Sequence, residues 1–155
     1  STFNIAIMTT NIATETANKS YKYNDSFFGK KLSDIVNSVH KHYSEKMKWT
    51  YKPLFPGTFG YDNLAISIAY TLSSIKNKKY EINELATLVH EGWIINYLYW
   101  RNNKPYLTNE IYKKPYNPLG DERRDKCASL SFDQLDKEEQ DKDIIIAEYL
   151  IKIIQ

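Results

Sequence analysis

The chain has a single cysteine, Cys127, among its 155 residues. One cysteine excludes a disulfide bond within the chain and is typical of proteins in a reducing compartment. The sequence also has no apolar run approaching the roughly 20 residues that cross a bilayer. Residues 1–4 lack the basic start of a secretory signal. We therefore expect a cytoplasmic protein without a membrane partner, located in the host cytoplasm or the virion if the source is a virus.

Net charge is also small, because 21 basic residues face 19 acidic ones and leave +2. This value argues against nucleic acid as a partner. The phosphate-binding loop, the dinucleotide fingerprint and the Gly-x-Ser-x-Gly nucleophile motif are all absent. His40 and His42 point in different directions on a helix, and His90-Glu91 lacks a second histidine one turn on, so no metal site is expected. These absences predict a protein that is not an enzyme and needs no cofactor.

Aromatic residues, in contrast, are abundant, at 14 % of the chain with 13 tyrosines. Aromatic side chains in excess of what a core needs often line binding surfaces. The alternative is codon bias in an AT-rich genome, which would also explain the many Lys, Asn and Ile residues. Composition leaves both explanations open.

Apolar residues spaced three and four apart predict four helices. They cover residues 30–48, 62–76 and 83–99, and the stretch from Asp136 to the end of the sequence. Asn83 is the expected N-cap of the third helix, and Asp136 with Glu139 is an expected capping box for the last.

Short β pieces are expected between the helices. Residues 3–9 alternate loosely and predict a strand, followed by an exposed arm up to residue 28. Prolines and a glycine predict mostly irregular chain over residues 101–130, where residues 106–107 and 128–130 are expected to pair. The expected fold class is therefore mainly α with short β pieces (α+β), in one domain.

An internal repeat is the most informative pattern in the sequence. The first copy has Val39-His40-x-x-Tyr43 followed by Trp49, and the second has Val89-His90-x-x-Trp93 followed by Trp100. In each copy the aromatic residue follows the histidine by three positions, which places both on one face of a helix. The two copies predict two related halves.

The second copy resembles the ryanodine-receptor repeat (RyR domain) family over about residues 80–155. The resemblance rests on Leu85-Ala86, His90-Glu91 and Trp93, and then on the acidic and basic run from Asp121 to Lys126. It continues through Ser131-Phe132, Leu135, Glu138-Glu139 and Asp143 into the apolar helix Ile144–Ile154. Over residues 32–76 the resemblance is looser, with Tyr43 where tryptophan is usual.

The family resemblance implies a fold and a function. Its repeats occur in tandem in calcium-release channels and also in bacterial and viral proteins. We expect two pseudo-symmetric helix-pair halves across a cleft: residues 1–28 form an N-terminal strand and arm, 29–79 a degenerate first repeat, and 80–155 the second. The implied activity is non-enzymatic binding of a small nucleotide-like ligand stacked on aromatic side chains.

The candidate ligand-binding residues are aromatic or basic. They are Tyr43, Trp49, Tyr51, His90, Trp93, Tyr97, Trp100, Arg123 and Arg124. An arginine can hold a phosphate with its planar fork. Tyr43 and Trp93 are equally well explained as core residues, the histidines as structural links to a loop, and the arginines as part of a solvated loop.

Three functions follow from these residues. The first is the ligand-binding module, and the second is a structural or protein-interaction module of a viral or bacterial assembly. The third, an enzyme, would need an acid–base pair with shifted pKa values in a cleft. Tyr43 and Trp93 facing one open cleft, with Arg123 or Arg124 at its rim, would favour the ligand-binding module.

Overall fold

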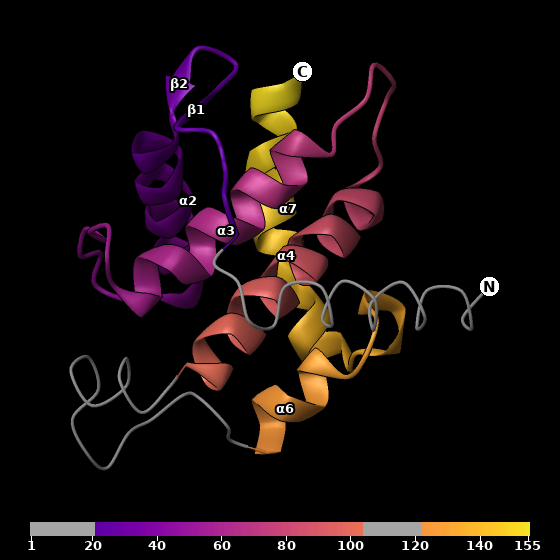
Figure 1. Ribbon diagram of the computed structural model, residues 1–155. Helices are drawn as coiled ribbons and strands as arrows, with labels where there is room; N and C mark the ends of the chain where they lie inside the picture. The colour runs from indigo at the N-terminus through magenta and orange to yellow at the C-terminus, as the bar shows by residue number, and fades with distance from the viewer. Residues whose placement is uncertain (1–20, 104–121) are drawn as a thin grey trace.

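The computed structural model describes residues 21–103 and 122–155, and α-helices make up most of them. They are α2 (Leu32–Met47), α3 (Phe59–Ser73), α4 (Ile82–Asn102), α6 (Glu122–Ala128) and α7 (Lys137–Ile154), with a 3-10 turn, η1 (Phe132–Gln134), before α7. Figure 1 shows α3, α4 and α7 crossing in the middle of the molecule, with α2 at one side and α6 at the end opposite the C-terminus. The prediction of a mainly α protein with short β pieces is confirmed.

The short β pieces form a hairpin directly before α2. Strands β1 (Ser26–Phe27) and β2 (Lys30–Lys31) are antiparallel, with Phe27 opposite Lys30. Phe28 and Gly29 join them with φ values of 50° and 75°, as a two-residue hairpin turn requires. The end of the predicted arm is thus a hairpin, which the sequence analysis missed. The predicted strands at residues 3–9 and 106–107 lie outside the described residues.

Helices α3 and α4 make the most extensive contact between elements, and they join the two predicted repeats directly. Gly92 of α4 lies against α3 so closely that a Cβ added there would be 2.7 Å from the Ser67 Cα. At the same crossing the Ser67 hydroxyl donates a hydrogen bond of 3.0 Å to the Val89 carbonyl. The two segments are therefore packed backbone against backbone over this crossing, rather than separated by a cleft there.

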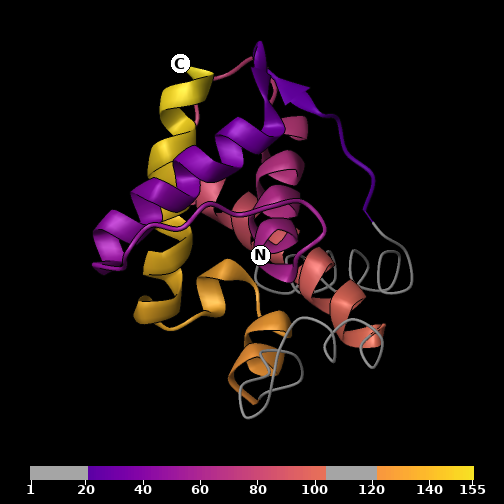
Figure 2. The same ribbon diagram turned by 90° about the vertical axis from the view of Figure 1, so that its left-hand side faces the viewer.

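Two larger apolar clusters and one small aromatic cluster form the core. The first cluster joins α2, α3 and the end of α7, with Val36, Val39 and Ile68 fully buried. The second joins α4, α6, η1 and α7 around Leu85 and Ala147. Helix α7 contributes to both, so it lies along the junction of the two predicted repeats, as both ribbon views show (Figures 1 and 2).

The helix starts differ from the expected caps. Glu81, not Asn83, is the N-cap of α4, and its backbone N–H donates to the Glu84 carboxylate at 3.1 Å. Asp136 is the N-cap of α7 as predicted, but its side chain makes no capping hydrogen bond. The predicted capping box with Glu139 is wrong, because the Glu139 side chain binds cations instead.

The prediction of irregular chain over residues 101–130 is wrong at both ends. Helix α4 continues to Asn102, and residues 122–128 form α6. Residues 128–130 are not a strand, because the Ser129 and Leu130 N–H groups donate to the carbonyls of Lys126 and Cys127 in a helical turn. The prolines that suggested irregular chain all precede this segment, and nothing in Glu122–Ala128 opposes a helix.

Candidate functional site

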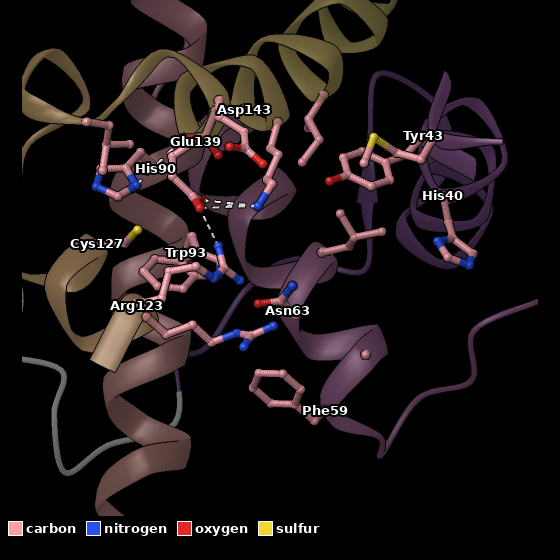
Figure 3. Close-up of a pocket in the computed structure, with 18 of the residues that line it drawn as sticks. His40, Tyr43, Phe59, Asn63, His90, Trp93, Arg123, Cys127, Glu139 and Asp143 are labelled. Carbon is pink, nitrogen blue, oxygen red and sulfur yellow. Dashed lines mark hydrogen bonds and ion pairs between the residues drawn. The ribbon is translucent and has the colours of Figure 1, made fainter. Parts of the chain in front are cut away.

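A cavity of about 570 Å³ lies between α2, α3, α4, α6 and α7. Its wall combines residues of both predicted repeats (Figure 3). The first repeat contributes His40, Tyr43, Met47, Trp49, Leu54, Phe59, Gly60, Asn63 and Leu64. The second contributes His90, Trp93, Arg123, Arg124, Cys127, Leu135, Glu138, Glu139, Lys142, Asp143 and Ile146.

Six of the nine candidate residues line this cavity. They are Tyr43, Trp49, His90, Trp93, Arg123 and Arg124. Figure 3 places Tyr43 on one side of the cavity and Trp93 with Arg123 on the other. The structure thus brings aromatic side chains from both sequence copies and two arginines into one cavity wall.

The other three candidates do not line the cavity. Tyr97 is fully buried, and its hydroxyl donates a hydrogen bond of 2.6 Å to Asp125. Trp100 is 3 % exposed and packs edge-on against Phe59, with ring centroids 5.3 Å apart. Tyr51 packs behind the wall, where its ring is 5.7 Å from that of His40. The helical spacing that selected Tyr97 and Trp100 instead reflects core packing.

Trp93 lies in a stack of three nearly parallel rings along α4. Its centroid is 5.9 Å from that of His90, one turn before, and 5.0 Å from that of Tyr97, one turn after. Because these neighbours already cover the ring along the helix direction, a ligand would meet mainly the edge of the indole. Tyr43, which is half-buried with Trp49 at 5.5 Å, offers the opposite aromatic surface.

His90 links α4 to the segment after α6 and also faces α7. Its Nε2 is 2.7 Å from the Leu130 carbonyl oxygen, and this nitrogen must carry the proton because a carbonyl only accepts. Burial lowers the pKa of His90, against the raising effect of the hydrogen bonds with the Leu130 and Cys127 backbones. The neutral ring therefore directs its unprotonated Nδ1 toward Asp143, whose Oδ2 is 3.7 Å away.

Asp143 and Glu139 are one turn apart on α7, yet their pKa values move in opposite directions. Burial, and then the negative charge of Glu139, raise the pKa of Asp143 well above its usual range. Burial also acts to raise the pKa of Glu139, but the hydrogen bond from Arg123 and the charges of Lys142 and Arg123 outweigh it and lower the value. At a given pH Glu139 is thus more fully ionised than Asp143.

Glu139 is held between two cations. An Arg123 Nη donates to Glu139 Oε1, and the Lys142 Nζ lies 3.3 Å from each Glu139 carboxylate oxygen. These interactions join α6 to the first turn of α7 (Figure 3). Three basic residues and two acidic ones line this part of the cavity besides Asp143, so its wall is net positive where Asp143 is protonated.

Three further wall residues bear on the chemistry. Burial raises the pKa of the Cys127 thiol, which therefore favours the unreactive protonated form. Burial also raises the pKa of the Tyr43 phenol, and the charges of Asp143 and Glu139 add to this effect, so the phenol remains a hydrogen-bond donor. Asn63 has a buried carboxamide oxygen without a partner among the described residues.

The acidic and basic residues of α7 in the cavity wall are not among the predicted site residues. They share one helix face with Ile146, because Glu139, Lys142, Asp143 and Ile146 follow one another at spacings of three, one and three. That spacing shows which residues share a face, but not whether the face borders a cavity or solvent. Asn63, which is also not among the predicted residues, has no comparable pattern around it.

Within residues 21–103 and 122–155, no helix is both long and apolar enough to cross a membrane. The same residues contain no group of three or more His, Cys, Asp or Glu side chains that could hold a metal ion.

Comparisons with protein-family models, with curated proteins and with solved structures found no match to this chain. The RyR resemblance therefore rests on the residues that carry it.

Proposed function

We propose that the chain is a non-enzymatic binding module of the RyR type, which holds a small nucleotide-like ligand in the cavity. The observation that supports this most is the joining of Tyr43, Trp93, Arg123 and Arg124 in one wall. Aromatic side chains pack against a base, and a guanidinium binds a phosphate in a planar, forked geometry. The two types of side chain together match the two ends of a nucleotide.

The size and polarity of the cavity agree with such a ligand. Small-molecule sites typically measure roughly 300–1,000 Å³, and this cavity measures about 570 Å³. The Asn63 oxygen, which has no partner among the described residues, would accept a hydrogen bond from an N–H group of a base. A buried acceptor without a partner costs about 1–3 kcal/mol, so a ligand that supplies a donor there would gain affinity.

Binding explains the charged residues better than catalysis does. The opposite pKa directions of Glu139 and Asp143 are what an acid–base pair would need. However, both Glu139 oxygens are already engaged by Lys142, and the Asp143 carboxyl faces the buried, neutral His90 ring. Neither carboxylate is therefore placed to transfer a proton without first breaking these contacts.

The test is a titration with AMP, GMP and adenosine in a phosphate-free buffer, followed by calorimetry and thermal shift. We expect saturable binding of a nucleotide that weakens about tenfold in Tyr43→Leu, because one base–aromatic contact contributes about 1–3 kcal/mol. Arg124→Gln should weaken binding of AMP but not of adenosine.

The matched control is Tyr51→Leu, which removes a candidate tyrosine that lies outside the cavity. Its affinity for nucleotide should equal that of the wild type. The proposal would be contradicted if none of the three probes binds at millimolar concentration. It would also be contradicted if Tyr43→Leu and Tyr51→Leu lose nucleotide affinity equally.

A second candidate is a protein-interaction module of a viral or bacterial assembly. It is favoured by aromatic side chains on the segment between α2 and α3, where Trp49 is 55 % and Phe55 67 % exposed. Sedimentation velocity over a range of concentrations would detect contacts between copies of the chain. Self-association that the double variant Trp49→Ser/Phe55→Ser abolishes would support this candidate, and a monomer at all concentrations would count against it.

A further inference from the structure

Glu139 lies where the cations of the cavity wall converge. The Lys142 Nζ is 3.3 Å from each carboxylate oxygen of Glu139, and an Arg123 Nη also donates to Oε1. One side chain from α6 and one from α7 thus bind the same carboxylate. A phosphate offers the same acceptor geometry to an arginine and a lysine, with one more oxygen and more negative charge.

We infer that the Glu139 carboxylate occupies the position that the terminal phosphate of a ligand takes, so that Glu139 acts as a built-in competitor for that phosphate. The phosphate would bind Arg123 and Lys142 after Glu139 has turned away. This inference rests on the proposed function, because it names the anionic part of the same site and the residue that limits its affinity.

The exposure of these side chains supports displacement rather than a fixed structural link. The side chain of Arg123 is 49 % exposed and that of Lys142 is 31 % exposed. Ion pairs at this exposure contribute little to stability, so a ligand can break them at small cost. The side chain of Glu139 is 19 % exposed and lines the cavity itself, so a ligand that enters the cavity reaches all three groups.

Competition of this kind makes a prediction about ligand charge. An anion with one or two negative charges competes poorly with a carboxylate held by two cations, whereas a polyphosphate, which carries more negative charge, competes well. We therefore expect the wild-type chain to bind pyrophosphate in preference to sulfate or acetate, and to bind a nucleoside diphosphate in preference to the monophosphate.

The experiment compares Glu139→Gln with Asp141→Asn, using inorganic pyrophosphate as the probe in calorimetry. Both variants remove one carboxylate charge from α7, but Asp141 is exposed and does not line the cavity. Glu139→Gln should bind pyrophosphate about tenfold more tightly than the wild type, because the competing negative charge is gone while Arg123 and Lys142 remain. Asp141→Asn should change the affinity by less than about twofold.

Circular dichroism and thermal melting establish that each variant is folded. Lys142→Gln is a second, independent variant, and it should weaken pyrophosphate binding at least about fivefold. Equal or weaker binding of pyrophosphate by Glu139→Gln, or unchanged binding by Lys142→Gln, would overturn the inference and make Glu139 a positioning residue for Arg123.

The outcomes separate this inference from the proposed function. Glu139→Gln could bind pyrophosphate more tightly than the wild type while a nucleoside diphosphate binds no better than pyrophosphate. This result would support the inferred phosphate position and contradict the proposed binding of a base. Nucleotide binding that depends on Tyr43, together with unchanged pyrophosphate affinity in Glu139→Gln, would support the proposed function and overturn the inference.

Discussion

His40 and His90 hold the same place in the two sequence copies, but their surroundings differ. His40 is half-buried, and its ring lies beside Tyr51 and bonds to the Lys52 backbone. His90 is 3 % exposed, and it donates to the Leu130 carbonyl and faces Asp143. Both rings link a helix to a later segment, but only the second lies beside the charged wall of the cavity.

The aromatic residues of the two copies differ in the same direction. Tyr43 is half-buried and contacts the exposed Trp49, whereas Trp93 is stacked between two neighbours in α4. The repeat thus places equivalent side chains at one cavity, while their chemistry depends on α6 and α7, which belong to the second copy, and α7 contacts α4 more than it contacts α2. A repeated sequence pattern therefore predicts where a side chain lies in the fold better than it predicts which groups surround that side chain.

Among the substitutions considered, Gly92→Ala should lower the stability most, because it disrupts the α3–α4 crossing that joins the two copies. A Cβ at residue 92 would be 2.7 Å from the Ser67 Cα, so the backbones of α3 and α4 must separate. We expect a loss of about 3 kcal/mol in the free energy of unfolding, measured by urea denaturation. Gly60→Ala, whose Cβ would meet only the Leu54 side chain at 3.4 Å, is the control and should be neutral or slightly stabilising. Equal effects of the two substitutions would show that the crossing does not hold the copies together.

Alanine at each histidine tests the difference between the copies directly. His90→Ala leaves the Leu130 carbonyl without its donor and removes one ring of a stack, so we expect a loss of about 2 kcal/mol. His40→Ala should cost less than about 1 kcal/mol because that ring is only partly buried. Chemical denaturation of both variants measures the difference, and a larger cost at His40 would reverse our interpretation.

Titration of Asp143 should contribute to the pH dependence of stability. The pKa of Asp143 is raised in the folded chain. Its contribution to the free energy of unfolding is therefore fully present below the unfolded pKa of about 4, and it is lost as the pH rises through the folded pKa. Asp143→Asn removes this loss. The free energy of unfolding of the variant should therefore rise relative to that of the wild type as the pH increases from 4 to 8. Each tenfold change in proton affinity corresponds to about 1.4 kcal/mol.

The buried partner of Asp143 acts in the opposite sense. The lowered pKa of His90 gives stability that is present above about pH 6.5 and is lost as the pH falls toward the folded value. In the wild type the two effects have opposite signs, whereas Asp143→Asn should show the His90 effect alone. Asp141→Asn, an exposed carboxylate of the same helix, supplies the baseline. Parallel profiles for the two variants would contradict the assignment.

Trp49→Ser should have the smallest effect on stability. Trp49 is 55 % exposed, so we expect a change within about 0.5 kcal/mol, whereas Trp100→Leu should cost more than about 2 kcal/mol because Trp100 is 3 % exposed. Thermal melting of both variants measures this contrast. A large loss in Trp49→Ser would show that the first copy is more tightly packed than its exposure indicates.

The helices could be predicted because burial of an apolar face leaves a local pattern in the sequence. Val39 and Val89 are both fully buried, as their helical spacing indicates. Helix α6 could not be predicted in this way, since a helix of 7 residues depends on partners distant in the sequence. One such partner is Arg101, whose guanidinium donates two hydrogen bonds to Asp125, at 2.7 and 2.9 Å.

The candidate site could be predicted in part for the same reason. Tyr43, Trp93 and the two arginines were selected by repeat and by residue type, and all four line the cavity. Glu139 and Lys142 were overlooked because charged residues on a terminal helix usually face solvent. Trp100 was wrongly selected, because an aromatic residue on the apolar face of a helix has the same spacing in a core as at a cavity.

The most direct test of the proposed site follows the indole N–H signals of the chain, which has three tryptophans, during a nucleotide titration by NMR. Trp93 lines the cavity, whereas Trp100 is buried and does not line it. Our account predicts that the Trp93 signal shifts and saturates with AMP or ADP while the Trp100 signal stays in place. A Trp93 signal that does not move at millimolar nucleotide would contradict it.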